Sequence, residues 1–341
     1  MNTRLRIGIA GLGRMGQRHA RALALSTPGA QLVAACSPLA DERDWARSEL
    51  GVAALYEDFG ALLRDPAIDA VAIVTPTSLH AEQTIAALQA GKHVFLEKPL
   101  ALDVATCERV AAVAARHPQQ VAMVGFVRRF DPSYQQAKAD IDAGAIGRPF
   151  LVRSQTGDMN DPQGFFVRFA PTSGGIFLDC SVHDIDLARW MLGNPRATRV
   201  FASGTIVLHP GLAECGDVDN GLAIVEFEGG ARALFYATRT LAHGHETASD
   251  IIGTAGVLSV GVGAHRDRVE MRDAHGVRHR PLLDFHERFH EAFEREMVEF
   301  VAACRGEKAL TLTLADATEA TRIAVAMTRS LRSGQVEVVG S

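Results

Sequence analysis

A glycine-rich turn near the amino terminus has the residue types and spacing of a dinucleotide-binding loop. Gly11-Leu12-Gly13-Arg14-Met15-Gly16 fits the pattern GxGxxG, directly after the apolar run Arg6–Ala10 and before an amphipathic stretch. In that context Gly11 makes the tight turn, Gly13 lets the backbone approach a pyrophosphate, and Gly16 lets helix and strand pack closely. The N–H groups at the start of the helix would hold the phosphates. The pattern therefore predicts binding of NAD(H) or NADP(H).

The end of the second expected strand leaves the choice between NAD and NADP open. NAD sites usually place an acidic residue there, which accepts hydrogen bonds from the adenosine ribose. This chain reads Ala34-Ala35-Cys36-Ser37-Pro38, so Ser37 stands in the acidic position. A hydroxyl can bond the ribose of NAD, and it does not repel the 2′-phosphate of NADP. Arg43, at the start of the following helix, lies close in sequence.

Three residues elsewhere in the chain could together oxidise a secondary alcohol. His183 suits the role of a base for the hydroxyl proton, because the unperturbed pKa of histidine is near neutrality. Asp179 lies four residues earlier and would share a helical face with it, where a carboxylate can orient the imidazole and stabilise its cation. Lys98 supplies a positive charge where an alkoxide develops. Pro99 restricts the lysine backbone to extended shapes and aims the side chain into a loop.

A second chemical motif indicates a different class of enzyme. His286-Glu287-Arg288-Phe289-His290 is a literal HExxH on an expected helix, the pattern of a zinc metalloprotease. The helix carries an apolar stripe at three- and four-residue steps, formed by Phe285, Phe289, Phe293, Met297 and Phe300. The histidines flank that stripe, no HxxGxxH extension follows, and neither Glu307 nor Glu319 lies in a partner motif. We interpret the match as accidental and expect no metal.

The first 125 residues supply the elements that must position the nucleotide loop. Strands are predicted at Leu5–Ala10, Gln31–Cys36, Ala70–Thr75, His93–Leu96 and Val121–Gly125. Helices are predicted at Gln17–Leu25, Asp41–Leu50, Asp58–Leu63, Ala81–Ala90 and Ala105–Arg116. The strand stretches are continuously apolar, as expected when both faces of a parallel sheet are covered. The alternation predicts an α/β Rossmann domain with a doubly wound parallel sheet over residues 1–125.

Residues 126–341 predict an α+β domain with a mostly antiparallel open sheet, which would bind substrate and form the oligomer. Strands are predicted at Phe150–Ser154, Arg199–Leu208, Gly221–Glu228, Ala231–Thr240 and Val257–Val260. Helices are fewer, at Asp184–Leu192, Phe285–Cys304 and Leu314–Leu331. The final helix, 314–331, could pack back on the first domain. No low-complexity linker separates the halves.

Composition excludes several classes of protein. Of 341 residues, 47% are hydrophobic and 22% charged, with a formal net charge of −5. This mild acidity predicts neither nucleic acid nor membrane as a partner. No apolar run approaches the about 18 residues of a membrane span, and the amino terminus lacks the long apolar stretch of a signal peptide. The five scattered cysteines are expected to be free thiols in a reducing cytoplasm.

Two further motifs carry a resemblance to a known family. Thr75-Pro76-Thr77-Ser78-Leu79-His80 precedes the stretch Gly91–Leu100, which contains Glu-Lys-Pro. The second motif, Gly174–Asp186, holds Gly-Gly, then Asp-x-x-x-His and a further Asp. With these motifs and the stretch Gly125–Asp131, essentially the whole chain resembles the glucose–fructose oxidoreductase/inositol dehydrogenase/rhizopine-catabolism (Gfo/Idh/MocA) family. The subgroup it most resembles is the inositol 2-dehydrogenases.

The resemblance implies an NAD(P)-dependent oxidoreductase that moves a hydride between nicotinamide and a secondary alcohol of a cyclic polyol or sugar, above all an inositol. It implies that Lys98, Asp179 and His183 form the catalytic group and that Glu97 lies near the nicotinamide. Further cofactor contacts are expected from Arg14, Met15, Ser37, Thr75, His80 and Lys98, beside Gly11, Gly13 and Gly16. Arg128 and His183 would contact the polyol, with a surface charge as the alternative role of Arg128.

The substrate-recognition stretches depart from those expected of inositol enzymes. Gln155–Asn160 falls where those enzymes carry a basic or amide-bearing loop, and Ala242–Glu246 falls where they often show Tyr-Gly-Tyr-Asp. His243 and His245 could replace phenol donors with imidazole donors, and we expect Asp158 and His243 at the substrate. A sugar (aldose) 1-dehydrogenase of the same family remains an alternative. A non-catalytic nucleotide sensor is disfavoured, because all three catalytic candidates are present.

The expected strands of the second domain also predict an assembly. Gly221–Phe227 and Ala231–Ala237 do not alternate cleanly between apolar and polar residues, so apolar side chains fall on both faces of the sheet. One face can pack on the chain's own helices, and the other needs a partner. Closed symmetry is the usual outcome of such contacts. We therefore expect a homodimer built sheet on sheet, paired again into a tetramer, as the resemblance also implies.

Overall fold

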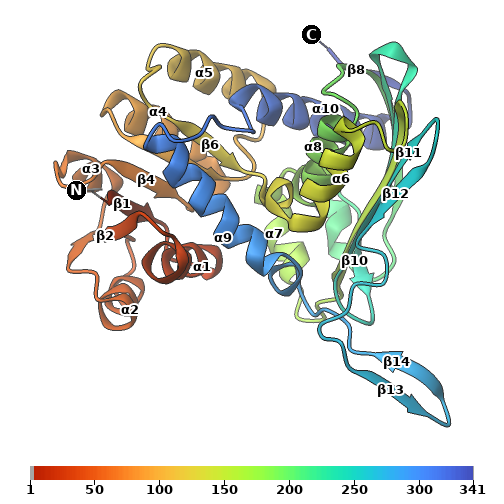
Figure 1. The fold of residues 1–341 in the computed structure, drawn as a ribbon, viewed down its shortest axis with the longest axis horizontal. Helices are drawn as coiled ribbons and strands as arrows, with labels where there is room; N and C mark the ends of the chain where they lie inside the picture. Colours follow the sequence, from red (N-terminus) through yellow and green to blue (C-terminus); the bar gives the residue numbers. More distant parts are fainter. Residues whose placement is uncertain (1–3, 341) are drawn as a thin grey trace. The chain divides into compact units, whose positions relative to one another are not determined.

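The chain, seen in a computed structural model that describes residues 4–340, divides into two compact units (Figure 1). One unit holds the residues up to Phe130 together with Glu291–Thr321, and the other holds Asp131–His290 together with the residues from Arg322 on. Residues 1–3 and 341, which begin and end the two predicted domains, lie outside the described residues.

The first unit is built on a six-stranded parallel sheet with the order β3-β2-β1-β4-β5-β6. The strands are β1 (Leu5–Ala10), β2 (Ala30–Cys36), β3 (Ala54–Tyr56), β4 (Ala70–Ile73), β5 (His93–Glu97) and β6 (Ala122–Gly125). Every pair of neighbours is parallel, and the central strands β1 and β4 are almost wholly buried. The predicted doubly wound sheet is confirmed, and the short edge strand β3 is an addition that the sequence did not predict.

Helices cover both faces of this sheet, as the continuous apolar strands require. They are α1 (Arg14–Arg21), α2 (Ala40–Leu50), α3 (Phe59–Arg64), α4 (Thr77–Gln89) and α5 (Val104–Ala115), and a π-helical turn, η1 (Ala22–Ser26), continues α1. Figure 1 shows α4 and α5 on one side of the sheet and α1 and α2 on the other. The first helix was predicted from Gln17, but it begins at Arg14, because the chain turns helical directly after Gly13.

The second unit is built on a seven-stranded sheet with the order β12-β11-β7-β10-β9-β8-β15. Its strands are β7 (Pro149–Met159), β8 (Ala197–Thr205), β9 (Asn220–Phe227), β10 (Arg232–Leu241), β11 (Glu246–Gly253), β12 (Val257–Val260) and β15 (Glu337–Val338). Only β7 and β10 pair in parallel, so the predicted mostly antiparallel sheet is confirmed. The sequence did not predict β11 or β15.

Several helical segments belong to the second unit. They are α6 (Pro132–Asp142), α7 (Phe165–Ser173) and α8 (Val182–Met191), with the turns η3 (Phe177–Ser181) and η4 (Pro210–Cys215). The sequence predicted only the helix that became α8. The long helices α9 (Phe285–Cys304) and α10 (Leu314–Ser333) contribute residues to both units. A hairpin of β13 (Glu270–Asp273) and β14 (Gly276–His279) projects from the second unit (Figure 1).

The two faces of the second sheet differ in what covers them. Ala223, Val225 and Phe235 are buried on the face that meets α8 and η3, and Figure 1 shows α6 and α8 on one side of the strands. On the opposite face Leu222 and Ile224 remain 52% and 48% exposed. The outward positions of β9 are thus apolar as well, which is the reason for the missing alternation in the sequence.

Candidate active site

The glycine-rich loop has the geometry that a dinucleotide needs. Gly11 has a φ of +88°, and a Cβ atom there would collide with the carbonyl oxygen of Val74. A Cβ at Gly16 would collide with the carbonyl oxygen of Gly11. At Gly13, in contrast, the nearest described heavy atom beyond the chain neighbours is Oε1 of Glu42, 3.9 Å from where a Cβ would lie. The backbone before α1 is therefore open, which fits a bound pyrophosphate.

Ser37 follows β2 beside this loop, and its side chain is already engaged. Its hydroxyl donates to Oε2 of Glu42 over 2.5 Å and accepts from the N–H of Leu39. The guanidinium of Arg43 donates to the carbonyl oxygen of Ser37 over 2.7 Å and pairs with Glu57 at 2.8 Å. Glu42 was not singled out by the sequence, because it lies five residues after Ser37, beyond a turn.

Glu97 and Lys98 lie at the carboxyl end of β5. One oxygen of Glu97 is 2.6 Å from Nε2 of His19, and the other accepts the N–H of Lys98 over 3.0 Å. Burial acts to raise the pKa of Glu97, but the hydrogen bond from His19 and the positive charge of Lys98 outweigh it and hold that pKa below its usual value. His19, from α1, is 1% exposed and packs against Phe95 at a tilt and edge-on against Phe293. It is a positioning residue that the sequence did not reveal.

His80 connects the loop after β4, which carries Thr75, to the segment after β5, which carries Pro99. The two ring nitrogens of His80 lie 2.9 Å from the carbonyl oxygen of Thr75 and 2.8 Å from that of Pro99. Burial lowers the pKa of His80 in spite of these contacts. The hydroxyl of Thr75 donates to Gln83 over 2.6 Å. His80 therefore joins the Thr75 loop to the segment that carries Lys98.

Asp179 and His183 lie in the second unit, four residues apart on successive turns of η3 and α8. The preceding Gly174 and Gly175 both have positive φ angles, 79° and 88°, so this turn requires glycine. The stretch that carries the two side chains is helical, with π-helical geometry over η3 and α-helical geometry from Val182 on. The turn ends where the N–H of Ile176 donates to Oδ1 of Asp217 over 2.9 Å.

Asp184, directly after His183, anchors the start of α8 to the sheet. Its buried carboxylate accepts from the hydroxyls of Ser154 and Thr156 on β7, each over 2.6 Å. Ser154 also bonds Ser249 on β11 at 2.7 Å. A carboxylate with two donors in a buried place fixes the residue beside it. Asp184 therefore helps to fix the backbone that carries His183.

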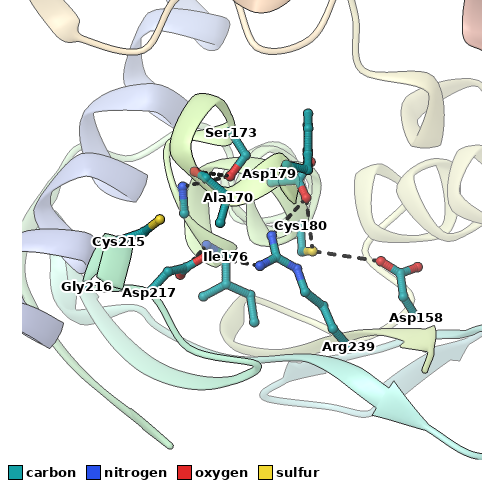
Figure 2. Close-up of polar contacts among 12 residues, drawn as sticks. Asp158, Ala170, Ser173, Ile176, Asp179, Cys180, Cys215, Gly216, Asp217 and Arg239 are labelled. Atoms are coloured by element: carbon teal, nitrogen blue, oxygen red, sulfur yellow. Dashed lines mark hydrogen bonds and ion pairs between the residues drawn. The ribbon is translucent and has the colours of Figure 1, made fainter. Parts of the chain in front are cut away.

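A buried arginine contacts the carboxylate of Asp179, as Figure 2 shows. Arg239 of β10 has no exposed side-chain surface, and its two terminal nitrogens lie 3.0 Å from Oδ2 of Asp179 and 3.0 Å from Oδ2 of Asp217. Burial alone would lower the pKa of Arg239, but Cys180, Asp179 and Asp217 around it raise that pKa above its usual value. The second oxygen of Asp217 holds Ile176, so one carboxylate links Arg239 to the glycine turn.

Asp158 and His245 lie on the other side of Cys180 in the same unit. Nδ1 of His245 is 3.0 Å from Oδ1 of Asp158, and Nε2 is 2.8 Å from the hydroxyl of Thr247. The His245 side chain is only 1% exposed, so its imidazole makes its hydrogen bonds inside the protein. His243, in contrast, is 59% exposed and lies 3.6 Å from Glu246. Of the two predicted imidazole donors, only His243 is open to a ligand.

The remaining site candidates divide between the units. Arg128 is in the first unit, in the short turn Val127–Phe130, where it is 4% exposed, so its alternative role as a surface charge is wrong. The structure places Gly11, Gly13, Arg14, Met15, Gly16, Ser37, Thr75, His80, Glu97, Lys98 and Arg128 in the first unit. It places Asp158, Asp179, His183 and His243 in the second.

The glutamate of the HExxH stretch makes contacts within the protein. Glu287 accepts from the N–H of Leu283 over 2.9 Å and pairs with Arg266 at 3.2 Å. The backbone leaves helical geometry at Phe289, with φ −115° and ψ 20°. Within residues 4–340, no group of three or more His, Cys, Asp or Glu side chains could hold a metal ion. No helix in that range is long and apolar enough to cross a membrane.

Comparison with known proteins decides the family. The model described as "Oxidoreductase family, NAD-binding Rossmann fold" matches residues 5–126, and the GFO/IDH/MocA C-terminal domain matches residues 134–259. The chain belongs to the Gfo/Idh/MocA oxidoreductase family. The resemblance expected from the sequence is confirmed.

Members of this family match over nearly the full length. The scyllo-inositol 2-dehydrogenase (NAD(+)) of Bacillus subtilis is 40% identical over 98% of this chain and 96% of its own. The myo-inositol 2-dehydrogenase of Thermotoga maritima is 33% identical over 87% of each chain. The structure of the Lactobacillus casei scyllo-inositol dehydrogenase with bound NAD(H) and scyllo-inositol is 38% identical, with a TM-score of 0.95 over 99% of this chain and 100% of that one.

The first test concerns Arg239. We expect Arg239→Gln to lower the free energy of unfolding by roughly 3 kcal/mol, because two carboxylates of the interior lose their cation. Arg232→Gln is the matched control: it lies on the same strand, its side chain is 42% exposed, and its loss should cost less than about 0.5 kcal/mol. Urea unfolding followed by circular dichroism measures both. Equal stability of the two variants would contradict the role of Arg239.

Proposed function

We propose that this protein is an NAD-dependent dehydrogenase that oxidises a secondary hydroxyl of an inositol. The full-length similarity to inositol dehydrogenases, one of them with NAD(H) and scyllo-inositol bound, carries the proposal. Two features of the structure support it: a glycine loop open at Gly13, and the Asp179–His183 pair at the start of α8. The five cysteines form no disulfide, which supports a cytoplasmic location as part of the same proposal.

The proposed mechanism assigns one task to each catalytic side chain. Bound NAD would supply the acceptor for the hydride. His183 takes the proton of the reacting hydroxyl, and Asp179 orients the imidazole and balances the charge that it gains. Lys98 holds its ammonium group near the same oxygen while negative charge develops there.

The surroundings of Asp179 favour His183 as the proton acceptor. Arg239 lies 3.0 Å from the Asp179 carboxylate and has no exposed side-chain surface. A carboxylate beside a buried guanidinium is stabilised in its charged form, so a proton that arrives on the imidazole stays there. Asp179 therefore acts by charge and orientation rather than by accepting the proton.

Substrate selection follows from the chemistry of the polyol. An inositol is uncharged and offers only hydroxyl groups, so its recognition requires hydrogen-bond donors and acceptors placed around the ring. Arg128, Asp158 and His243 are the candidates for this role. Asp158 is already hydrogen-bonded to His245, which fixes its orientation before substrate arrives. We propose scyllo-inositol and myo-inositol as the first compounds to test.

We further propose that the enzyme is a homodimer joined through its second sheet, or a tetramer of such dimers. Phe201, Ile224 and Leu234 lie in register across β8, β9 and β10, and they are 42%, 48% and 39% exposed. Leu222 extends this row at 52% exposure. An aligned row of apolar side chains on a sheet face favours burial against a second copy.

Catalysis is tested by substitution of the three side chains. Lys98→Ala and His183→Ala should each lower kcat by roughly 100-fold or more, the usual contribution of electrostatic and acid–base groups. Asp179→Asn should cost less if Asp179 only orients His183. The measurement is NADH formation at 340 nm with a panel of inositols and aldoses. Turnover by His183→Ala near that of the parent would overturn the assignment, and oxidation of aldoses alone would identify a sugar 1-dehydrogenase.

Assembly is tested by a charge on the apolar row. Ile224→Glu should reduce the mass in light scattering from a multiple of the chain mass toward 36.6 kDa, because the charge would be buried in the proposed interface. Leu25→Glu is the matched control: Leu25 is 73% exposed and lies in the first unit, so the same change there should leave the mass unchanged. A parent protein with a mass near 36.6 kDa at micromolar concentration would contradict the proposed dimer.

A further inference from the structure

We propose that Glu42, in the first turn of α2, binds the adenosine ribose and makes this enzyme select NAD over NADP. The inference rests on the proposed NAD-dependent function and assigns to Glu42 the role that an acidic residue at the end of β2 has in other NAD sites. Ser37 occupies that strand end here.

The position of the Glu42 carboxylate is defined by contacts on two sides. Its Oε2 atom accepts the hydroxyl of Ser37 over 2.5 Å, which ties it to the end of β2. Its Oε1 atom lies 3.9 Å from where a Cβ of Gly13 would be. The carboxylate thus lies between the end of β2 and Gly13, the glycine at which the protein backbone can approach the pyrophosphate of the cofactor. This is the place where the ribose hydroxyls of a bound dinucleotide are read.

Local structure explains how a helix residue arrives there. The chain leaves β2 at Cys36 and begins α2 at Ala40, so only three residues separate strand and helix. Glu42 then falls in the first helical turn, where a negative charge complements the helix dipole. The N–H of Leu39 donates to the Ser37 hydroxyl over 3.1 Å and fixes the turn between the two elements. The serine therefore acts as the link that holds the displaced acid in place.

Arg43, a cation close to the strand end that could have favoured NADP, contacts other partners. Arg43 donates to the carbonyl oxygen of Ser37 over 2.7 Å and pairs with Glu57 at 2.8 Å. Its side chain is only 16% exposed. A 2′-phosphate at the ribose would instead face the Glu42 carboxylate, and like charges a few ångströms apart repel strongly outside bulk water. The ribose hydroxyls of NAD would donate to the same carboxylate.

The inference is tested by direct cofactor binding, without turnover. The dissociation constants of NADH and NADPH are measured for the full-length protein by titration of the cofactor fluorescence. We expect Glu42→Gln to lower the ratio of the NADPH constant to the NADH constant by about 10-fold or more, because the amide repels no phosphate. Glu49→Gln is the matched control: it lies on the same helix, its side chain is 51% exposed, and its ratio should equal that of the parent.

A rescue variant separates a charge effect from a damaged turn. Ser37→Asp introduced into Glu42→Gln returns a carboxylate to the strand end, and it should restore the preference for NADH. An unchanged ratio in Glu42→Gln, with NADH still bound, would overturn the role of Glu42. A reduced ratio that Ser37→Asp fails to restore would also overturn it, because the effect would then come from the turn. If the parent binds neither cofactor, the proposed function itself fails.

Discussion

The ion pair between Arg239 and Asp179 is the interaction on which the second unit depends. The Asp179 side chain is only 19% exposed, and a carboxylate withdrawn from water needs a cation or several hydrogen-bond donors. Arg239 meets this need from near the carboxyl end of the central strand β10, and its guanidinium has no exposed surface. Its second bond, to Asp217, also fixes the glycine turn that starts η3. Charge balance and backbone geometry at Asp179 are therefore set by one side chain.

The same physical rule operates in the first unit. Glu97 is held in its charged form by His19 and Lys98, in spite of its burial. Glu296, nearby on α9, is fully buried, and its pKa is raised well above the usual value by burial and by the charges of Glu97 and Glu299. The pKa values of these two buried carboxyl groups thus move in opposite directions, because His19 and Lys98 lie beside Glu97 whereas Glu296 faces the negative charges of Glu97 and Glu299. The arrangement concentrates negative charge at the end of β5 that carries Lys98.

The sequence predicted elements with a strong local pattern. β1, β12 and α9 have the predicted bounds, because their apolar periodicity is unbroken. It failed where tertiary contacts override the local pattern. β11 begins with the polar and small residues Glu-Thr-Ala-Ser-Asp rather than an apolar run, and it is a strand that pairs with β7 on one side and β12 on the other. α7 contains Pro171, which argues against a helix in the sequence.

The site residues divide along the same line. Glycines at fixed offsets and an aspartate four residues before a histidine are local patterns, and they were found. Arg239 is a lone charge 60 residues from Asp179 in the chain, and His19 is 78 residues from Glu97, so no spacing reveals either pair. Departures from the expected pattern were informative nevertheless. Two such departures are Ser37, which stands where NAD sites usually have an acidic residue, and the apolar residues on both faces of β9. In the first case Glu42 of α2 lies at the strand end, and in the second the exposed row on β8, β9 and β10 is the surface on which we propose that a second copy packs. A residue that breaks a local rule is therefore the place in this sequence to look for a long-range partner.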